Sequence, residues 1–189
     1  MEALSRLVVF ERECLGKRIL KGDVIVSEES TLESSDSLPA TPDRGDADVA
    51  GEIRIDIHAY DEAEEAIKAV RFAVFTAEQG VSLAEDIDGL DDRCVQLLAC
   101  AGSTAVGTAR MLPDAHIGRI AVLAPWRGHG IGGRMVRLLL KIARNEGHSS
   151  CYLHAQTHAI AFYEGLGFEA VGDEFIDAGI AHRKMICRF

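Results

Sequence analysis

The 189-residue sequence predicts a mixed α/β (α+β) domain, in which a mostly antiparallel sheet is flanked by helices. Two patterns carry this prediction. Ile53, Ile55 and Ile57 alternate with polar residues, which is the period-2 pattern of a half-buried strand. From Ile131 to Ile142, apolar residues recur at the i, i+4, i+7, i+8 and i+11 spacing of one helix face. Short turns join the strands expected between these two segments, and such turns favour antiparallel pairing.

The other elements follow in the order β-α-β-β-β-α-β-α-β-β. A helix that Asp61 can cap and Gly80 can end follows the first strand and reaches about Gln79. The stretch 81–93, VSLAEDIDGLDDR, is expected to be an acidic loop. Two more helices are expected, one from about 130 to 147 and one over 158–165. Further strands are expected at 95–101, 105–112, 117–123, 150–156, 168–175 and 181–188.

The first 52 residues differ in composition from the rest. Residues 27–52 are rich in Ser, Asp, Glu and Pro and lack apolar periodicity, which predicts a disordered linker. We therefore expect an N-terminal extension over 1–52, partly disordered across 27–52, and one folded domain over 53–189. The formal net charge is −10, with most of the excess acid in the linker, and this charge disfavours nonspecific binding to nucleic acid.

Cysteine spacing and hydropathy indicate the cellular compartment of the protein. The five cysteines show no C-x-x-C spacing, and no stretch approaches the ~20 apolar residues of a membrane-spanning helix. A reduced, cytoplasmic protein with no nucleic-acid and no membrane partner is therefore expected. His154 and His158 would resemble a metal pair only on one helix, and a change from strand to helix separates them, so no metal is expected.

The most informative segment is the glycine-rich run RGHGIGG, from Arg127 to Gly133, between an apolar strand and a helix. The first backbone amides of a helix lack partners and carry partial positive charge, and glycines let a ligand approach the backbone closely. The run therefore predicts a pyrophosphate site, with Arg127, His129 and Arg134 adding local positive charge.

The glycines alone leave other interpretations open. Gly128, Gly130 and Gly133 satisfy the G-x-G-x-x-G pattern of dinucleotide-binding enzymes, but too few residues follow them for the rest of a doubly wound sheet. No acidic residue ends a strand about 20 residues further on, and no Gly-Lys-Ser/Thr of a P-loop follows. A dinucleotide site and a purely structural turn remain alternatives.

Two motifs resemble those of the GNAT superfamily of acyl-CoA-dependent N-acyltransferases. The cofactor motif of that family runs from a strand ending in Val-x-Pro into Arg/Gln-x-x-Gly-x-Gly/Ala, and residues 127–132 match it after the strand end at 120–122. Its Ala-x-x-Phe/Leu-Tyr-x-x-x-Gly-Phe helix turn is similar to residues 159–168, AIAFYEGLGF. The resemblance covers residues 53–189, and the segment 78–81, EQGV, is similar to a subgroup of small, mostly uncharacterised members.

The resemblance implies a GNAT fold, whose mixed, mostly antiparallel central sheet is splayed at the cofactor cleft and carries helices on both faces. It also implies that acetyl-CoA binds as cosubstrate, without a metal, where the strands 117–123 and 150–156 separate. Many members have Asn at the position of Gln156, so this chain keeps the amide on a longer side chain. The residues implied to contact the cofactor are Ile120, Ala121, Val122, Arg127, Gly128, His129, Gly130, Ile131, Gly132, Gly133 and Gln156.

As implied by the resemblance, the acetyl group passes to a primary amine by direct attack, and Tyr163 protonates the departing thiolate. A base must help, because a primary amine is protonated at pH 7. Glu78, His154 and His182 are the candidates, and we assign Glu78 and His154 to catalysis and His182 to substrate binding. From the residues alone, Tyr163 could instead be a core tyrosine, Glu78 a solvated carboxylate and either histidine a structural one.

The acceptor is expected to be a small cationic amine. Asp88 and Asp91, in the acidic stretch 81–93, are predicted to attract it at the rim of the cleft. A solvated turn is the plainer explanation of these acids. The alternative function is a non-catalytic acyl-CoA-binding sensor or interaction module, and a homodimer is among the possible assemblies.

Overall fold

The computed structural model describes residues 52–189, so the predicted N-terminal extension lies outside the described residues apart from Glu52. The elements are β1 (Ile53–His58), α2 (Tyr60–Arg71), α3 (Leu83–Asp86), β2 (Val95–Ala101), β3 (Thr104–Met111), β4 (Ile117–Val122), α4 (Ile131–Asn145), β5 (Ser150–Gln156), α5 (Ile160–Glu164), β6 (Glu169–Asp177) and β7 (Ile180–Arg188). The strands and the three predicted helices follow the predicted order, and α3 is an additional helix that was not predicted. None of the described helices is long and apolar enough to cross a membrane.

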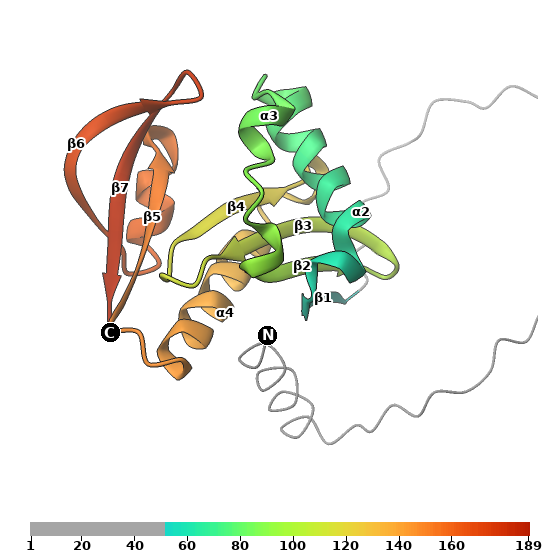
Figure 1. Cartoon of the computed structure of the whole chain (residues 1–189), viewed down its shortest axis with the longest axis horizontal. Helices are drawn as coiled ribbons and strands as arrows, with labels where there is room; N and C mark the ends of the chain where they lie inside the picture. Colours follow the sequence, from blue (N-terminus) through green and yellow to red (C-terminus); the bar gives the residue numbers. More distant parts are fainter. Residues whose placement is uncertain (1–51) are drawn as a thin grey trace, which may run out of the picture. The chain divides into compact units, whose positions relative to one another are not determined.

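The strands form two antiparallel sheets, which stand apart from each other in Figure 1. The first sheet is a meander of order β1-β2-β3-β4, in which each strand pairs with the next one along the chain. The second sheet has the order β5-β7-β6, so the last strand lies between the two earlier ones. The predicted antiparallel architecture is confirmed, and its splay is wide enough to divide the strands into two sheets.

Helices cover both faces of the first sheet. On one face, Ile67 of α2 packs against Leu98 of β2. Gly107 of β3 pairs with Ala99, the neighbour of Leu98, and a Cβ atom at Gly107 would lie 3.3 Å from the Cε atom of Met135 in α4. Because successive residues of a strand point to opposite faces, α2 and α4 lie on opposite sides of the sheet.

The helix predicted to run to Gln79 changes its winding part-way. After α2 ends at Arg71, the chain continues as a π-helix over Phe72–Glu78. Such π-helical segments are rare and occur frequently at functional sites. Phe75 and Gln79, at this end of the helix, line the cavity described below.

The segment 81–93 was predicted to be a loop, and this prediction is wrong over two helical turns. The first turn is α3, and Asp91–Arg93 forms a 3₁₀ turn. A capping box starts α3, in which the Glu85 amide donates to the Ser82 hydroxyl and the Ser82 amide donates to the Glu85 carboxylate. These reciprocal bonds satisfy amides that a short helix would otherwise leave unpaired.

Candidate active site

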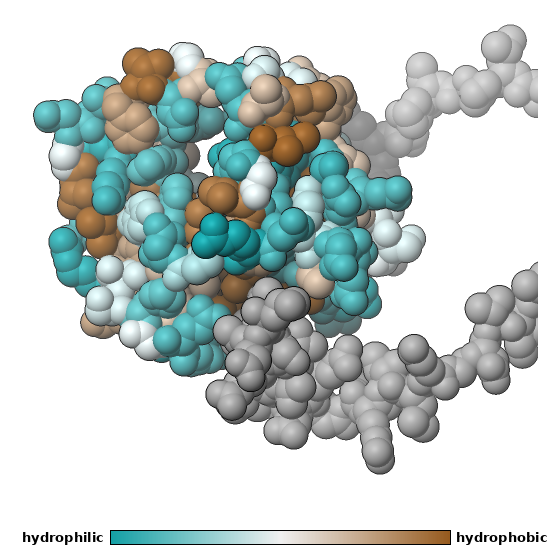
Figure 2. Space-filling model, in the orientation of Figure 1, coloured by the Kyte–Doolittle hydropathy of each residue, from teal (hydrophilic) through white to brown (hydrophobic). Residues whose placement is uncertain are grey.

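A cavity of about 460 Å³ lies between the two sheets, where β4 and β5 separate. In the part of the chain that the structure describes, the sheets meet at a parallel bridge between His116 and Tyr152, where the Tyr152 amide donates to the carbonyl of Ala115 at 3.2 Å. From this vertex the two strands diverge. The opening is visible as a hollow between the two lobes in Figure 2.

An irregularity in β4 shapes one wall of the cavity. Ala121 pairs with Thr108 and Gly118 pairs with Arg110, so β4 holds one residue more than β3 between these two pairs. Arg119 lies in this bulge, with a φ of 51°. A bulge bends its strand and increases its twist. Beyond it, the outer edge of β4 has no partner strand in the two described sheets.

The predicted cofactor residues of β4 line the cavity: they are Ile120, Ala121 and Val122. Arg127 also lines it and is anchored at both ends of its guanidinium. Its Nε atom donates to the carbonyl of Val122 at 3.0 Å, and its Nη2 atom lies 2.5 Å from the Glu78 carboxylate. Arg127 therefore extends the cavity wall from the end of β4 to the start of the glycine run.

The glycine run forms the N-terminus of α4. Gly130 is the residue before the helix and has a φ of 74°, a conformation that a residue with a side chain rarely adopts. The first amide of this helix to donate a backbone hydrogen bond is that of Arg134, to the carbonyl of Gly130 at 3.0 Å. Among residues 52–189, the amides of 131–133 find no acceptor, so this helix end presents free donors to an anion.

The side chain of Arg134 is not part of this positive end. Its Nη2 atom donates to the carbonyl of Ile53 at 2.8 Å and so ties α4 to β1. At position 132, a Cβ atom would lie 3.6 Å from Phe162, so α5 packs closely against the start of α4. The two predicted family motifs therefore lie next to each other.

Tyr163 of α5 reaches the cavity from the side of the second sheet. Its ring packs edge-on against Phe162 and Phe168, and its hydroxyl has no hydrogen-bond partner within the described range 52–189. Burial raises the pKa of Tyr163 to about 12, so the phenol holds its proton at neutral pH. Gln156, at the end of β5, also lines the cavity, and its amide donates to the Gln79 side chain at 3.1 Å.

Comparison with known proteins assigns the chain to a family. Residues 58–189 match the family model described as an acetyltransferase (GNAT) domain. The chain belongs to the GNAT acetyltransferase family. The N-acetyltransferase YjcF of Bacillus subtilis is 37% identical over 121 residues, which are 62% of this chain and 86% of that protein.

Solved GNAT structures have the same fold. An acyl-CoA N-acyltransferase from Pseudomonas aeruginosa superposes with a TM-score of 0.66 at 25% identity, covering 72% of this chain and 99% of that one. A GNAT acetyltransferase from Elizabethkingia anophelis, solved with acetyl-CoA bound, superposes with a TM-score of 0.54 at 16% identity, over 72% and 98% of the two chains. The dinucleotide interpretation of the glycine pattern is therefore wrong, and the antiparallel sheets agree with this, because a dinucleotide fold needs a parallel one.

The candidate bases of this GNAT domain lie in different places. Glu78 is held by Arg127 and is not among the cavity-lining residues. His154 of β5 and His182 of β7 both line the cavity. The Nδ1 atom of His182 lies 2.9 Å from the Ile180 carbonyl. Burial lowers the pKa of His154, and the Asp177 carboxylate opposes this shift.

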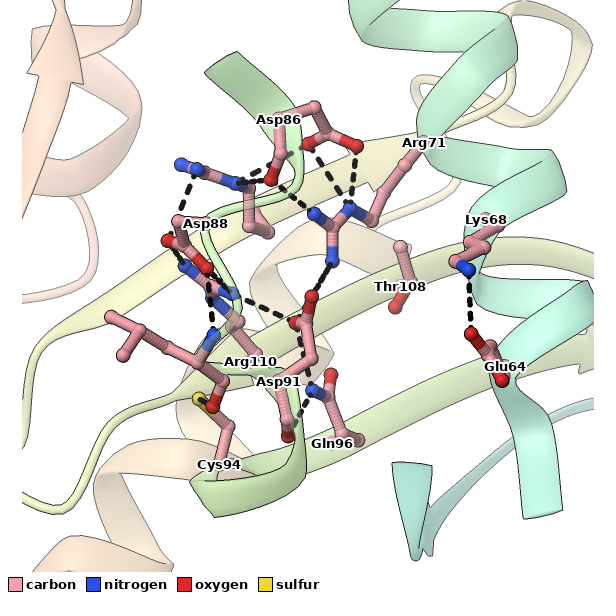
Figure 3. Close-up of polar contacts among 12 residues, drawn as sticks. Glu64, Lys68, Arg71, Asp86, Asp88, Asp91, Cys94, Gln96, Thr108 and Arg110 are labelled. Atoms are coloured by element: carbon pink, nitrogen blue, oxygen red, sulfur yellow. Dashed lines mark hydrogen bonds and ion pairs between the residues drawn. The ribbon is translucent and has the colours of Figure 1, made fainter. Parts of the chain in front are cut away.

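The predicted acceptor-binding residues Asp88 and Asp91 do not line the cavity. They belong to a group of ion pairs, shown in Figure 3, that holds the segment 81–93 against the first sheet. Asp91 is 4% exposed and accepts hydrogen bonds from Arg71 at 2.9 Å and from Arg110 at 2.8 Å. Asp88 pairs with Arg110 and with Arg119.

In these contacts, arginines of the same domain neutralise the negative charges of the two acids. A hydrogen bond from Arg110 lowers the pKa of Asp88 to about 2. Burial favours the neutral form of Asp91, but the hydrogen bond from Arg110 and the charge of Arg71 outweigh it, so the pKa of Asp91 is also lowered. Both carboxylates are therefore ionised and neutralised by arginines, which leaves little charge to attract an amine.

The cavity-lining residues that the sequence analysis did not single out include His116, Glu85 and Asp177. His116 lies at the vertex of the two sheets, Glu85 in α3 and Asp177 at the end of β6. None of them belongs to a motif. They become neighbours of one cavity only because β4, α3 and the β6–β7 hairpin converge on it.

Proposed function

We propose that this protein transfers the acetyl group of acetyl-CoA to a primary amine by direct attack. One observation carries the proposal: a single cavity brings together the unpaired edge of β4, Arg127 and the free hydroxyl of Tyr163. This arrangement offers a place for the cofactor arm and a proton donor in the same space. A cytoplasmic location belongs to the same proposal, supported by the free thiols of the four described cysteines.

In this proposal the pyrophosphate binds to the amides at the start of α4, where the helix dipole favours an anion. Arg127 then exchanges Glu78 for a phosphate oxygen. The amide groups of the pantetheine arm pair with the backbone of Ile120 and Val122, as a short added strand would. Gln156 reaches the cofactor from the opposite wall.

The chemistry needs two proton movements. Freeing a primary amine of its proton at pH 7 costs about 4–5 kcal/mol, so a base must take the proton. We assign this role to His154 rather than Glu78, because His154 lines the cavity and its lowered pKa keeps it uncharged and able to accept. When it is protonated, Asp177 stabilises the imidazolium.

Tyr163 acts on the leaving group. Its phenol is protonated at neutral pH and donates a hydrogen bond to the departing sulfur. The Val122 amide polarises the thioester carbonyl as an oxyanion donor. The amine nitrogen forms its bond to the carbonyl carbon while the carbon–sulfur bond breaks.

The charges of the cavity favour a cationic acceptor. The guanidinium groups of Arg110 and Arg119 are paired with aspartates, so neither is free for an acceptor carboxylate. Glu85 and Asp177 line the same space, and neither forms an ion pair with a residue of the described domain. An amine with a second ammonium group fits this balance better than an amino acid does.

Two measurements test the proposed function. Thermal-shift titrations compare acetyl-CoA, CoA and NAD, and a ligand at 100 times its dissociation constant adds about 2.7 kcal/mol of stability. Thiol release from acetyl-CoA is then followed with 1,4-diaminobutane, butylamine and β-alanine. We expect both CoA forms to stabilise the protein and turnover to fall in that order of acceptors. Stabilisation by CoA without thiol release from any acceptor would favour the acyl-CoA sensor instead.

A further inference from the structure

His116 lines the cavity at the bridge where β4 and β5 meet. Its backbone amide donates to Asp114 at 3.2 Å, but within the range 52–189 neither nitrogen of its ring has a hydrogen-bond partner. An imidazole in a cavity wall with two free nitrogens is equipped for a partner that enters with the ligand.

The ring of His116 is held in a fixed orientation. It stacks on the ring of Tyr152, with the centroids 4.5 Å apart and the planes 6° from parallel. The Tyr152 hydroxyl donates to Asp114 at 2.6 Å, so one carboxylate holds both the backbone of His116 and the ring beneath it. The amino group of Lys184 lies 4.6 Å from the centre of the Tyr152 ring. Little rotational freedom has to be lost when a ligand binds this ring.

The surroundings keep the ring uncharged. Burial, followed by the neighbouring His154, lowers the pKa of His116 to about 4, and Arg110 and Arg119 act in the same direction against Asp114. A neutral imidazole carries one N–H donor and one acceptor nitrogen. It can therefore accept a hydrogen bond from an amine without repelling the positive charge that the amine brings.

We infer that His116 is a specificity-determining residue that accepts a hydrogen bond from an N–H of the acceptor amine. The inference rests on the proposed function. In the attack, the amine nitrogen bonds to the thioester carbon, the carbon–sulfur bond breaks, and Tyr163 donates its hydrogen bond to the sulfur. The acceptor enters as an ammonium ion, so His154 takes two protons from the nitrogen in turn, one before the attack and one as the carbon–nitrogen bond forms, and returns both to solvent.

His116 binds the hydrogen that remains on the nitrogen. A primary amine keeps one N–H after both proton transfers, as the N–H of the product amide, and this N–H donates to His116. A secondary amine loses its last N–H to His154 and leaves the His116 nitrogen without a partner. His116 therefore makes the site select primary over secondary amines.

The test compares 1,4-diaminobutane with N,N′-dimethyl-1,4-diaminobutane as acceptors. His116→Phe keeps the stack on Tyr152 but removes the acceptor nitrogen, and His116→Asn keeps an acceptor. We expect His116→Phe to lower kcat/KM for the primary diamine by about 10- to 100-fold, the range for leaving a buried N–H donor without its acceptor. The value for the dimethyl compound changes less than threefold, and His116→Asn retains most of the preference.

The control is His148→Phe in the turn before β5, outside the cavity, which leaves the preference unchanged. The acetyl-CoA dissociation constant, measured in parallel, stays the same in every variant. The inference is overturned if His116→Phe lowers both acceptors equally, or lowers neither. An equal loss together with weakened acetyl-CoA binding would show that His116 is only structural.

A second measurement uses the wild-type protein and depends neither on turnover nor on whether a variant folds. In wild-type protein with ¹⁵N-labelled histidine and bound CoA, added 1,4-diaminobutane shifts the signal of the unprotonated His116 nitrogen without protonating the ring. No shift overturns the inference. If the wild type releases no thiol with either diamine but this shift occurs, the proposed function fails for these acceptors while the role of His116 in binding stands.

Discussion

Replacing Arg71 tests whether the buried ion pairs hold the cavity wall in place. Its side chain is 1% exposed, and its guanidinium donates to Asp86 at 3.0 Å and to Asp91 at 2.9 Å. A third hydrogen bond reaches the Asp86 carbonyl. Arg71→Met keeps much of the length of the side chain but leaves both buried carboxylates with one cation fewer.

The expected loss is large because the penalty falls on charges that remain buried. Removing one partner of a buried ion pair costs about 3–5 kcal/mol. The total stability of a domain is about 5–15 kcal/mol, so this single change would consume a large part of it. At roughly 2–4 °C for each kcal/mol, the melting temperature falls by roughly 6–20 °C.

Urea denaturation followed by circular dichroism measures this loss against a matched variant. Arg54→Met breaks the exposed pair between Arg54 and Asp56, whose side chains are 69% and 39% exposed, and should cost less than about 1 kcal/mol. Equal losses in the two variants, or a loss below 1 kcal/mol for Arg71→Met, would refute the assignment of the network as the support of this wall.

Three further predictions concern catalysis, the glycine run and pH. Tyr163→Phe should lower kcat at least about 100-fold, with acetyl-CoA affinity unchanged in a binding titration, because the hydroxyl forms no hydrogen bond with a described residue; a kcat within threefold of wild type would exclude Tyr163 from the reaction. Gly130→Ala should cost about 1–2 kcal/mol in thermal unfolding because φ is 74°, whereas Gly132→Ala, whose Cβ would make only ordinary contacts, should cost little; equal costs would contradict the backbone explanation. Because the pKa of Asp88 falls from 3.8 to about 2 on folding, its contribution to stability is present above pH 4 and is lost as the pH falls towards 2. Asp88→Asn should therefore make the unfolding free energy depend less on pH over that range. An unchanged slope of unfolding free energy against pH would count against the ion pair with Arg110.

Local patterns were enough to predict most of the fold. The alternation at Ile53–Ile57 and the apolar face of α4 each reflect one buried side of an element, and burial of that side is what the three-dimensional structure requires. The start of a helix at the glycine run was predicted because the backbone geometry there depends on residue types within a few positions. These local patterns can be recognised without knowing which elements become neighbours in the fold.

Other features depend on contacts between distant segments. The π-helix at Phe72–Glu78 follows α2 directly and has only seven residues, too few for the spacing of apolar residues to distinguish it from an α-helix. The acids of the segment 81–93 resembled a solvated loop, because the arginines that neutralise Asp91 lie 20 residues before it and 19 after it. His116 carries no motif, and its importance comes from the meeting of β4 with β5.

The strand order β5-β7-β6 has a consequence for how the protein is made. β5 and β6 leave the ribosome before β7, yet β7 is the strand to which both of them bond. The meander β1–β4 pairs neighbour with neighbour, so its local contacts form quickly as the chain grows. A nascent chain that ends at β6 thus carries a nearly finished first sheet facing an unfolded second wall. It has the glycine run but not the second wall of the cavity, so the cavity is complete only after β7 has paired with β5 and β6.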